Sequence, residues 1–185
     1  LNFKSNQKTL VSQADDGTQF TRQVDGQKFS LTLSFPLKSR TQINPLIAFI
    51  MKQRSRKETF TITLPEYIGS AKGTVAGSPT GTASAGATSI TLGGTRSGSL
   101  LAGDLIKFAS HNKIYMVVTD NSDISSGTLT IEPPLKETIS GSAITFDSVP
   151  ITVRLTNDIQ EFSSNINDVN GELLYNFELD VVEAI

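Results

Sequence analysis

The chain has 185 residues, with 16 Lys and Arg, 18 Asp and Glu and one His, which gives a formal net charge of -2. It contains no cysteine, and this excludes disulfide frameworks, thiolate metal sites and cysteine nucleophiles. The near-neutral charge argues against a general nucleic-acid binder and against a protein held to membranes by basic patches, because both need an excess of Lys and Arg.

Strands and a turn are predicted in the first third of the chain. Apolar and polar residues alternate over residues 29–35 and again over 59–64. A period of two is typical of antiparallel strands that cover a core with one face. Asp25-Gly26 lies between the stretches 18–24 and 27–35, and this dipeptide predicts the two-residue turn of a β-hairpin.

Residues 39–54 have the apolar spacing of a helix, with one stripe formed by Ile43, Leu46, Ile47 and Ile50. Asn44 followed by Pro45 fits an N-cap and a first helical position. A cap at Ser39 or Thr41 is the alternative, and it would place the proline inside the helix. We expect this helix to pack on a sheet.

The composition changes near residue 69. Residues 69–98 are rich in Gly, Ser, Thr and Ala, which is typical of a flexible linker or of the start of an inserted module. Short strand candidates about ten residues apart favour the module, because this spacing is typical of a small barrel or sandwich. These candidates are 89–92, 104–108, 113–119, 128–131 and 143–146. The long alternation returns over residues 151–155 and 173–182.

The fold prediction is a mainly β chain with one flanking α-helix. Residues 1–68 and 149–185 are predicted to form one discontinuous antiparallel β domain. Residues 69–148 are predicted to form a small inserted, barrel-like β module. The longest apolar run, residues 46–51, is far shorter than the roughly 18 residues of a membrane span, so we expect no membrane insertion.

Few residues suggest catalysis. His111 is the one histidine and lies between two predicted strands, which favours an exposed turn. The carboxylate pairs Asp15/Asp16 and Glu178/Asp180 have the chemistry for acid–base work on a glycoside. Glu178 and Asp180, however, share the polar face of one predicted strand, which favours a solvated face or a subunit contact. We therefore predict a non-enzymatic protein with no catalytic, cofactor or metal site.

Seven stretches carry a resemblance to a known family. They are QKFSLTLSFPL from residue 27, INPLIAFIM from 43, ETFTITLP from 58, AGDLIKF from 102, LTIEPPL from 129, VRLTNDIQEF from 153 and YNFELDVVEA from 175. Together they resemble the structural tail proteins of tailed bacteriophages, of the tail-tube-like or distal tail (baseplate ring) kind.

The resemblance implies a tail-tube-like antiparallel β-sandwich and a role in assembly. About six copies would close into a ring that continues the DNA conduit and joins the tail tube to the tip or to receptor-binding components. The implied partners are further copies of the chain, other tail proteins (tube, hub or receptor-binding) and DNA that passes without specific binding. The implied location is the tail of the virion, after synthesis in the host cytoplasm.

On this reading, polar strand faces and carboxylates become candidate subunit or lumen contacts. A conduit for DNA should avoid tight phosphate binding, so carboxylates suit its lumen. The candidates are Thr59, Thr61, Thr63, Thr152, Arg154, Asp15, Asp16, Glu178 and Asp180.

Two other functions compete with the structural one. The inserted module could bind carbohydrate or a receptor, with Phe108, Tyr115 or Phe146 stacking on sugar rings. A glycan hydrolase that uses two carboxylates is the third hypothesis.

Overall fold

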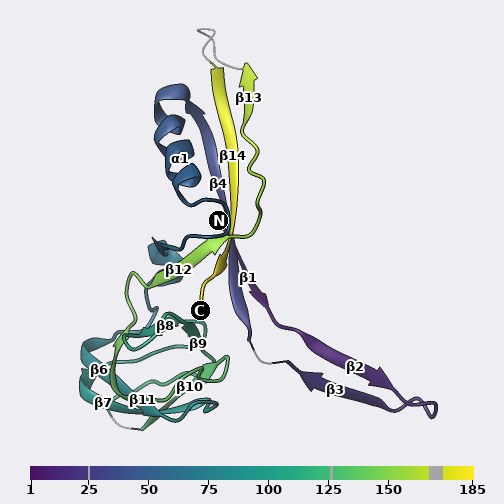
Figure 1. The fold of residues 1–185 in the computed structure, drawn as a ribbon. Coiled ribbons are helices and arrows are strands. Elements are labelled where there is room, and N and C mark those ends of the chain that lie inside the picture. Colours follow the sequence, from purple (N-terminus) through teal and green to yellow (C-terminus); the bar gives the residue numbers. More distant parts are fainter. Residues whose placement is uncertain (25, 126, 167–172) are drawn as a thin grey trace. The chain divides into compact units, whose positions relative to one another are not determined.

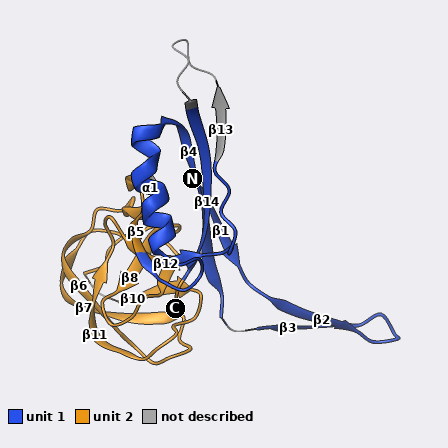
Figure 2. Cartoon of the chain, turned by 45° about the horizontal axis from the view of Figure 1, so that its top comes forward, with its two compact units in different colours: residues 1–60, 153–183 blue, residues 61–152, 184–185 orange. Residues whose placement is uncertain are grey.

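The computed structural model describes residues 1–24, 26–125, 127–166 and 173–185. The chain is mainly β, its sheets are antiparallel, and it divides into two compact units. The first unit contains Leu1–Phe60 and Val153–Glu183, and the second contains Thr61–Thr152 and Ala184–Ile185 (Figure 2).

The main sheet has the strand order β1-β4-β14-β12-β5, with β13 also pairing with β14. Figure 1 labels all of these strands except β5. A separate two-stranded sheet contains β2 and β3. The elements are β1 (Asn2–Asn6), β2 (Thr9–Gln13), β3 (Gln19–Gln23), β4 (Lys28–Ser39), α1 (Arg40–Lys52), β5 (Phe60–Thr63), β12 (Pro150–Leu155), β13 (Ser163–Ile166) and β14 (Leu173–Glu183).

The long pair β4–β14 forms the centre of the first unit. Leu31 of β4 pairs with Val181 of β14, and Phe177 is the partner of Phe35. The predicted alternation is confirmed, because Leu31, Phe177 and Val181 are buried on one face of the pair. Helix α1 contacts both strands and buries Ile43 and Ile50. The predicted packing of this helix on a sheet is thus confirmed.

The helix starts earlier than Asn44-Pro45. Ser39 is the N-cap, and its backbone N–H donates to Oε1 of Gln42 at 3.3 Å. Pro45 lies inside the helix, where its ring removes one N–H from the backbone ladder. Of the two predicted starts, the one at Asn44 is wrong and the one at Ser39 is right.

The predicted hairpin at Asp25-Gly26 is wrong. Asp25 lies outside the described residues, but the strands on either side of it have other partners, since β3 pairs with β2 and β4 pairs with β1 and β14. The turn that does join paired strands contains Asp16-Gly17. There Gly17 has a φ of 86° and donates its N–H to the carbonyl oxygen of Ala14 at 2.9 Å.

The second unit contains a closed six-stranded barrel, which confirms the predicted barrel-like module. Its order is β10-β7-β6-β11-β8-β9. The elements are α2 (Glu66–Gly69), β6 (Ala76–Ala83), β7 (Ser89–Ser97), β8 (Leu105–Phe108), β9 (Ile114–Val117), β10 (Thr128–Glu132) and β11 (Ile139–Thr145). The sequence did not predict β6. The linker reading is therefore wrong for residues 76–97, where β6 and β7 pair along their length.

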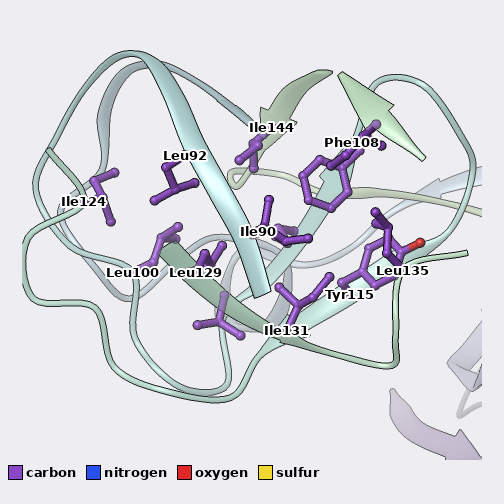
Figure 3. Close-up of a cluster of buried hydrophobic side chains, with 13 residues drawn as sticks. Ile90, Leu92, Leu100, Phe108, Tyr115, Ile124, Leu129, Ile131, Leu135 and Ile144 are labelled. Carbon is purple, nitrogen blue, oxygen red and sulfur yellow. The ribbon is translucent and has the colours of Figure 1, made fainter. Parts of the chain in front are cut away.

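One apolar cluster fills the barrel (Figure 3). It contains Ile90, Leu92, Leu100, Ile106, Phe108, Tyr115, Val117, Ile124, Leu129, Ile131, Leu135, Ile139 and Ile144. Most of these side chains have no solvent exposure, so the interior is a packed core.

Candidate functional site

Two carboxylates predicted as contacts lie on the polar face of the β4–β14 pair. The hydroxyl of Ser34 donates to Oε1 of Glu178 at 3.0 Å, and the hydroxyl of Thr32 donates to Oδ1 of Asp180 at 2.7 Å. Each hydroxyl residue is the direct cross-strand partner of its carboxylate. The bonds therefore hold both carboxylates over the sheet while leaving them exposed to solvent.

Arg154 of β12 lies on the same face as these carboxylates. It pairs with Val182, which is two residues beyond Asp180 and so points to the same side of the sheet. Lys4 and Lys28 also face this side, through the register of β1 with β4. Three exposed cations and two exposed carboxylates give this surface, called here the polar sheet face, a nearly balanced charge.

The remaining predicted strand residues lie in the second unit or next to its boundary. Thr61 and Thr63 are exposed on β5, and Thr152 is half-buried on β12, where it points to the same side of the strand as Arg154. Thr59 is exposed just before β5. The structure therefore brings together Arg154, Glu178 and Asp180 from the predicted set.

An open groove borders the polar sheet face on β14. It has a volume of about 680 Å³ and is lined by residues 157–161, Asn176, Phe177, Glu178 and Asp180. Ile159 at its edge is 79% exposed. The groove is thus an acidic surface with one prominent apolar side chain.

Asp15 and Asp16 lie at the turn of the β2–β3 hairpin. Oδ1 of Asp16 accepts the backbone N–H of Thr18 at 2.9 Å. Hydrogen bonds from Thr18 lower the pKa of the Asp16 carboxyl. Asp16 therefore helps to form the turn.

The hairpin itself is the most exposed structure in the described chain. All ten residues of β2 and β3 are exposed. Among them are three large apolar residues, Leu10 at 49%, Val11 at 60% and Phe20 at 61% exposure. Leu10 pairs with Arg22 and Ser12 pairs with Phe20, so Leu10 and Phe20 are diagonal neighbours on one face. This surface was not predicted from the sequence, although the dipeptide Asp16-Gly17 is a turn signal that indicates the hairpin.

His111 lies in the turn between β8 and β9, but it is half-buried rather than freely exposed. Its Nδ1 lies 3.1 Å from Oγ of Ser110 and its Nε2 lies 2.7 Å from Oη of Tyr115. Burial lowers the pKa of His111, and the charge of Glu137 partly opposes this effect. Both ring nitrogens are therefore occupied by protein contacts.

The aromatic residues proposed for sugar stacking are mostly in the core. Phe108 and Tyr115 have no solvent exposure, and Phe146 is half-buried against the same cluster. A sugar ring cannot reach the faces of Phe108 and Tyr115 in this structure. Phe108 and Tyr115 are therefore core residues, and of the three aromatic candidates only Phe146 is partly exposed.

Across the described residues, no three or more His, Asp or Glu side chains are arranged to hold a metal ion. No helix in the described ranges has the length and apolar character needed to cross a membrane. Comparison with protein-family models and with curated proteins gives no match to the chain.

Proposed function

We propose that the chain is a non-enzymatic structural protein of a bacteriophage tail or baseplate. Copies of it form a ring that continues the DNA conduit and joins the tail tube to the tip or to receptor-binding components. The proposal starts from the sequence resemblance and depends on one structural observation, the exposed β2–β3 hairpin.

That hairpin has features of a contact with another chain. An isolated two-stranded hairpin is at best marginally stable in water. Yet both faces of this one are exposed along every residue, and Leu10, Val11 and Phe20 are open to solvent. Burial of apolar side chains against a neighbouring subunit would stabilise the hairpin and the assembly together.

The polar sheet face supports the role of a conduit. A surface that guides DNA without holding it needs few uncompensated cations, since affinity for phosphate grows with each one neutralised. Here Glu178 and Asp180 lie on the same face as Arg154, Lys4 and Lys28. This near balance suits weak contact with passing DNA.

The finer fold belongs to the same proposal. Residues 1–68 and 149–185 would be the ring-forming, tail-tube-like sandwich, and residues 69–148 the inserted module. Support comes from the long β4–β14 pair with α1 packed on it. The near-balanced charge of the polar sheet face and the exposed hairpin strands agree with assembly.

The test is electron microscopy and light scattering on the purified chain, together with labelled antibody against it on whole phage particles. Rings of about six copies, or label confined to the tail or its tip, are the expected results. The label position separates tube from baseplate. A strict monomer with label on the fibres or capsid would contradict the proposal and favour the receptor-binding alternative.

A further inference from the structure

One end of the barrel is crossed by residues 133–138, which connect β10 to β11. Leu135 is buried in the barrel core (Figure 3). Its N–H donates to the carbonyl oxygen of Ala87 at 2.9 Å, and its carbonyl oxygen accepts the N–H of Gly86 at 2.7 Å. Residues 133–138, called here the plug, are therefore hydrogen-bonded to the β6–β7 turn.

The hydrogen-bonded pair Tyr115 and His111 also contacts the plug. The backbone N–H of Lys136 donates to Oη of Tyr115 at 3.0 Å. The same hydroxyl lies 2.7 Å from Nε2 of His111, and Tyr115 has no solvent exposure. Nδ1 of His111 contacts Oγ of Ser110, whose N–H donates to Oγ of Ser142 on β11. The imidazole thus links the β8–β9 turn to the plug through one buried hydroxyl.

We propose that His111 and Tyr115 form an acid-sensitive latch for residues 133–138. A neutral imidazole has one donor and one acceptor nitrogen, so either neutral tautomer satisfies its contacts with Tyr115 and Ser110. A protonated ring donates from both nitrogens. Neither Tyr115 nor Ser110 can then donate to it, so the hydroxyl that did so loses its acceptor, and a positive charge lies in a half-buried position.

The charges around the ring also disfavour its protonation. Lys107 of β8, Lys113 before β9 and Lys136 of the plug oppose a positive charge on His111, and Glu137 of the plug favours it. Loss of hydration is the largest effect, because water solvates the charged ring less completely when the latch is closed.

The direction of the pH response follows from this difference. With the latch open, His111 takes up a proton near its ordinary pKa of about 6.5. With the latch closed, protonation needs a lower pH. The closed state therefore has its full stability above about pH 6.5, the ordinary pKa of histidine. It loses stability relative to the open state as the pH falls from that value through the lowered pKa of the closed state.

Amide hydrogen exchange followed by NMR on the full chain tests the latch. We compare protection factors for Lys136, Leu135 and the reference amide of Val117, which donates to the carbonyl oxygen of Asp104 in the same barrel. From about pH 7.5 to about pH 5.0, we expect protection of Lys136 and Leu135 to fall at least about threefold more than that of Val117. The variant His111→Gln, which cannot titrate, should lose this difference.

Three outcomes would overturn the latch: equal protection of Lys136 at both pH values, the same loss in His111→Gln, or an equal loss at Val117, which would mean unfolding of the whole barrel. The variant Tyr115→Phe keeps the buried ring and should lower Lys136 protection at both pH values. Direct NMR titration of the wild-type imidazole needs no variant. A midpoint at or above about 6.5 also overturns the proposal.

Discussion

A Cβ atom on Gly81 of β6 would lie 2.7 Å from the ring carbon Cε1 of Phe108 and 2.9 Å from Cγ2 of Ile90. Phe108 and Ile90 are both fully buried. The ring of Phe108 thus occupies the space that a side chain at position 81 would need. Because barrel cores are packed at close to crystal density, neither neighbour can move without disturbing others.

We expect Gly81→Ala to lower the free energy of unfolding of the barrel by roughly 1–3 kcal/mol, the usual range for overpacking. The opposing gain, from a less flexible unfolded chain, is only about 0.4–1 kcal/mol. Urea unfolding followed by circular dichroism measures the difference. Ser78→Ala, at an exposed position of the same strand, is the control and should change stability by less than about 0.5 kcal/mol. Equal stability of the two variants would show that position 81 has room.

Phe177 tests the core of the first unit. Its ring is 2% exposed and stacks with Phe35 at 5.9 Å and with Phe162 at 4.9 Å between ring centroids. We expect Phe177→Ala to cost about 3–5 kcal/mol of stability in urea unfolding. Phe20→Ala, at an exposed position, is the matched control and should cost less than about 0.5 kcal/mol in the unassembled chain. A loss below roughly 1 kcal/mol at Phe177 would contradict the packing of β4 against β14.

The hairpin provides a test of assembly. For the proposed ring, we expect Leu10→Ser combined with Phe20→Ser to abolish assembly, because it removes the apolar pair on one face of the hairpin. Light scattering and electron microscopy are the measurements. The control is Gln13→Ser combined with Gln19→Ser, a directly paired polar position of the same two strands.

The two double variants also show whether a loss of assembly comes from a lost contact or from a folding defect. Unfolding of the barrel should be unchanged in both, since β2 and β3 belong to the first unit. Rings that persist in the apolar variant would show that another surface holds the copies together.

Asp16 should make the hairpin turn sensitive to strong acid. The hydrogen bonds from Thr18 lower the pKa of this carboxyl in the folded turn, so the unfolded turn takes up its proton at a higher pH. The stabilisation is present above the ordinary aspartate pKa of about 3.9 and is lost as the pH falls through the lowered value. NMR titration of the Thr18 amide should give a midpoint below about 3.9, and Asp16→Asn should remove it. A midpoint at or above that value would contradict the turn geometry.

Much of the fold could be predicted from local patterns. Alternation predicted β4, β12 and β14, and a stripe at helical spacing predicted α1, because one face of each is buried. Strand β6 was missed, since its residues are mostly small and polar. The close approach of Phe108 to Gly81 explains why a small residue is needed there. That requirement arises from packing and cannot be recognised in the strand's own sequence.

The hairpin error has a different cause. The dipeptides Asp16-Gly17 and Asp25-Gly26 give the same turn signal, and the choice depends on which strands pair. Strand β4 pairs with β14, which lies about 140 residues further along the chain, and β3 pairs with β2 instead. Local turn chemistry does not contain that information.

The candidate surface was predicted only in part. The alternation in β14 placed Glu178 and Asp180 on one polar face, as observed. Their hydroxyl partners Ser34 and Thr32 are 144 and 148 residues away in sequence, so their contacts depend on a register that no local pattern specifies. The buried contacts of His111 were also missed, although its partner Tyr115 is only four residues away, because the sequence indicated an exposed turn and does not show where the Tyr115 hydroxyl points.

Closure of the barrel also determines where uncontrolled aggregation can start. Each of its six strands is bonded on both sides, so the barrel presents no strand edge to another chain. The main sheet is open and ends at β1 and β5, and β2 and β3 pair only with each other within the described ranges. Templated growth of strands between molecules is therefore expected at the edges of the main sheet and of the hairpin, not at the barrel. At a high concentration of the chain those edges would need to be covered, whereas the barrel has no free strand edge to which another chain could add.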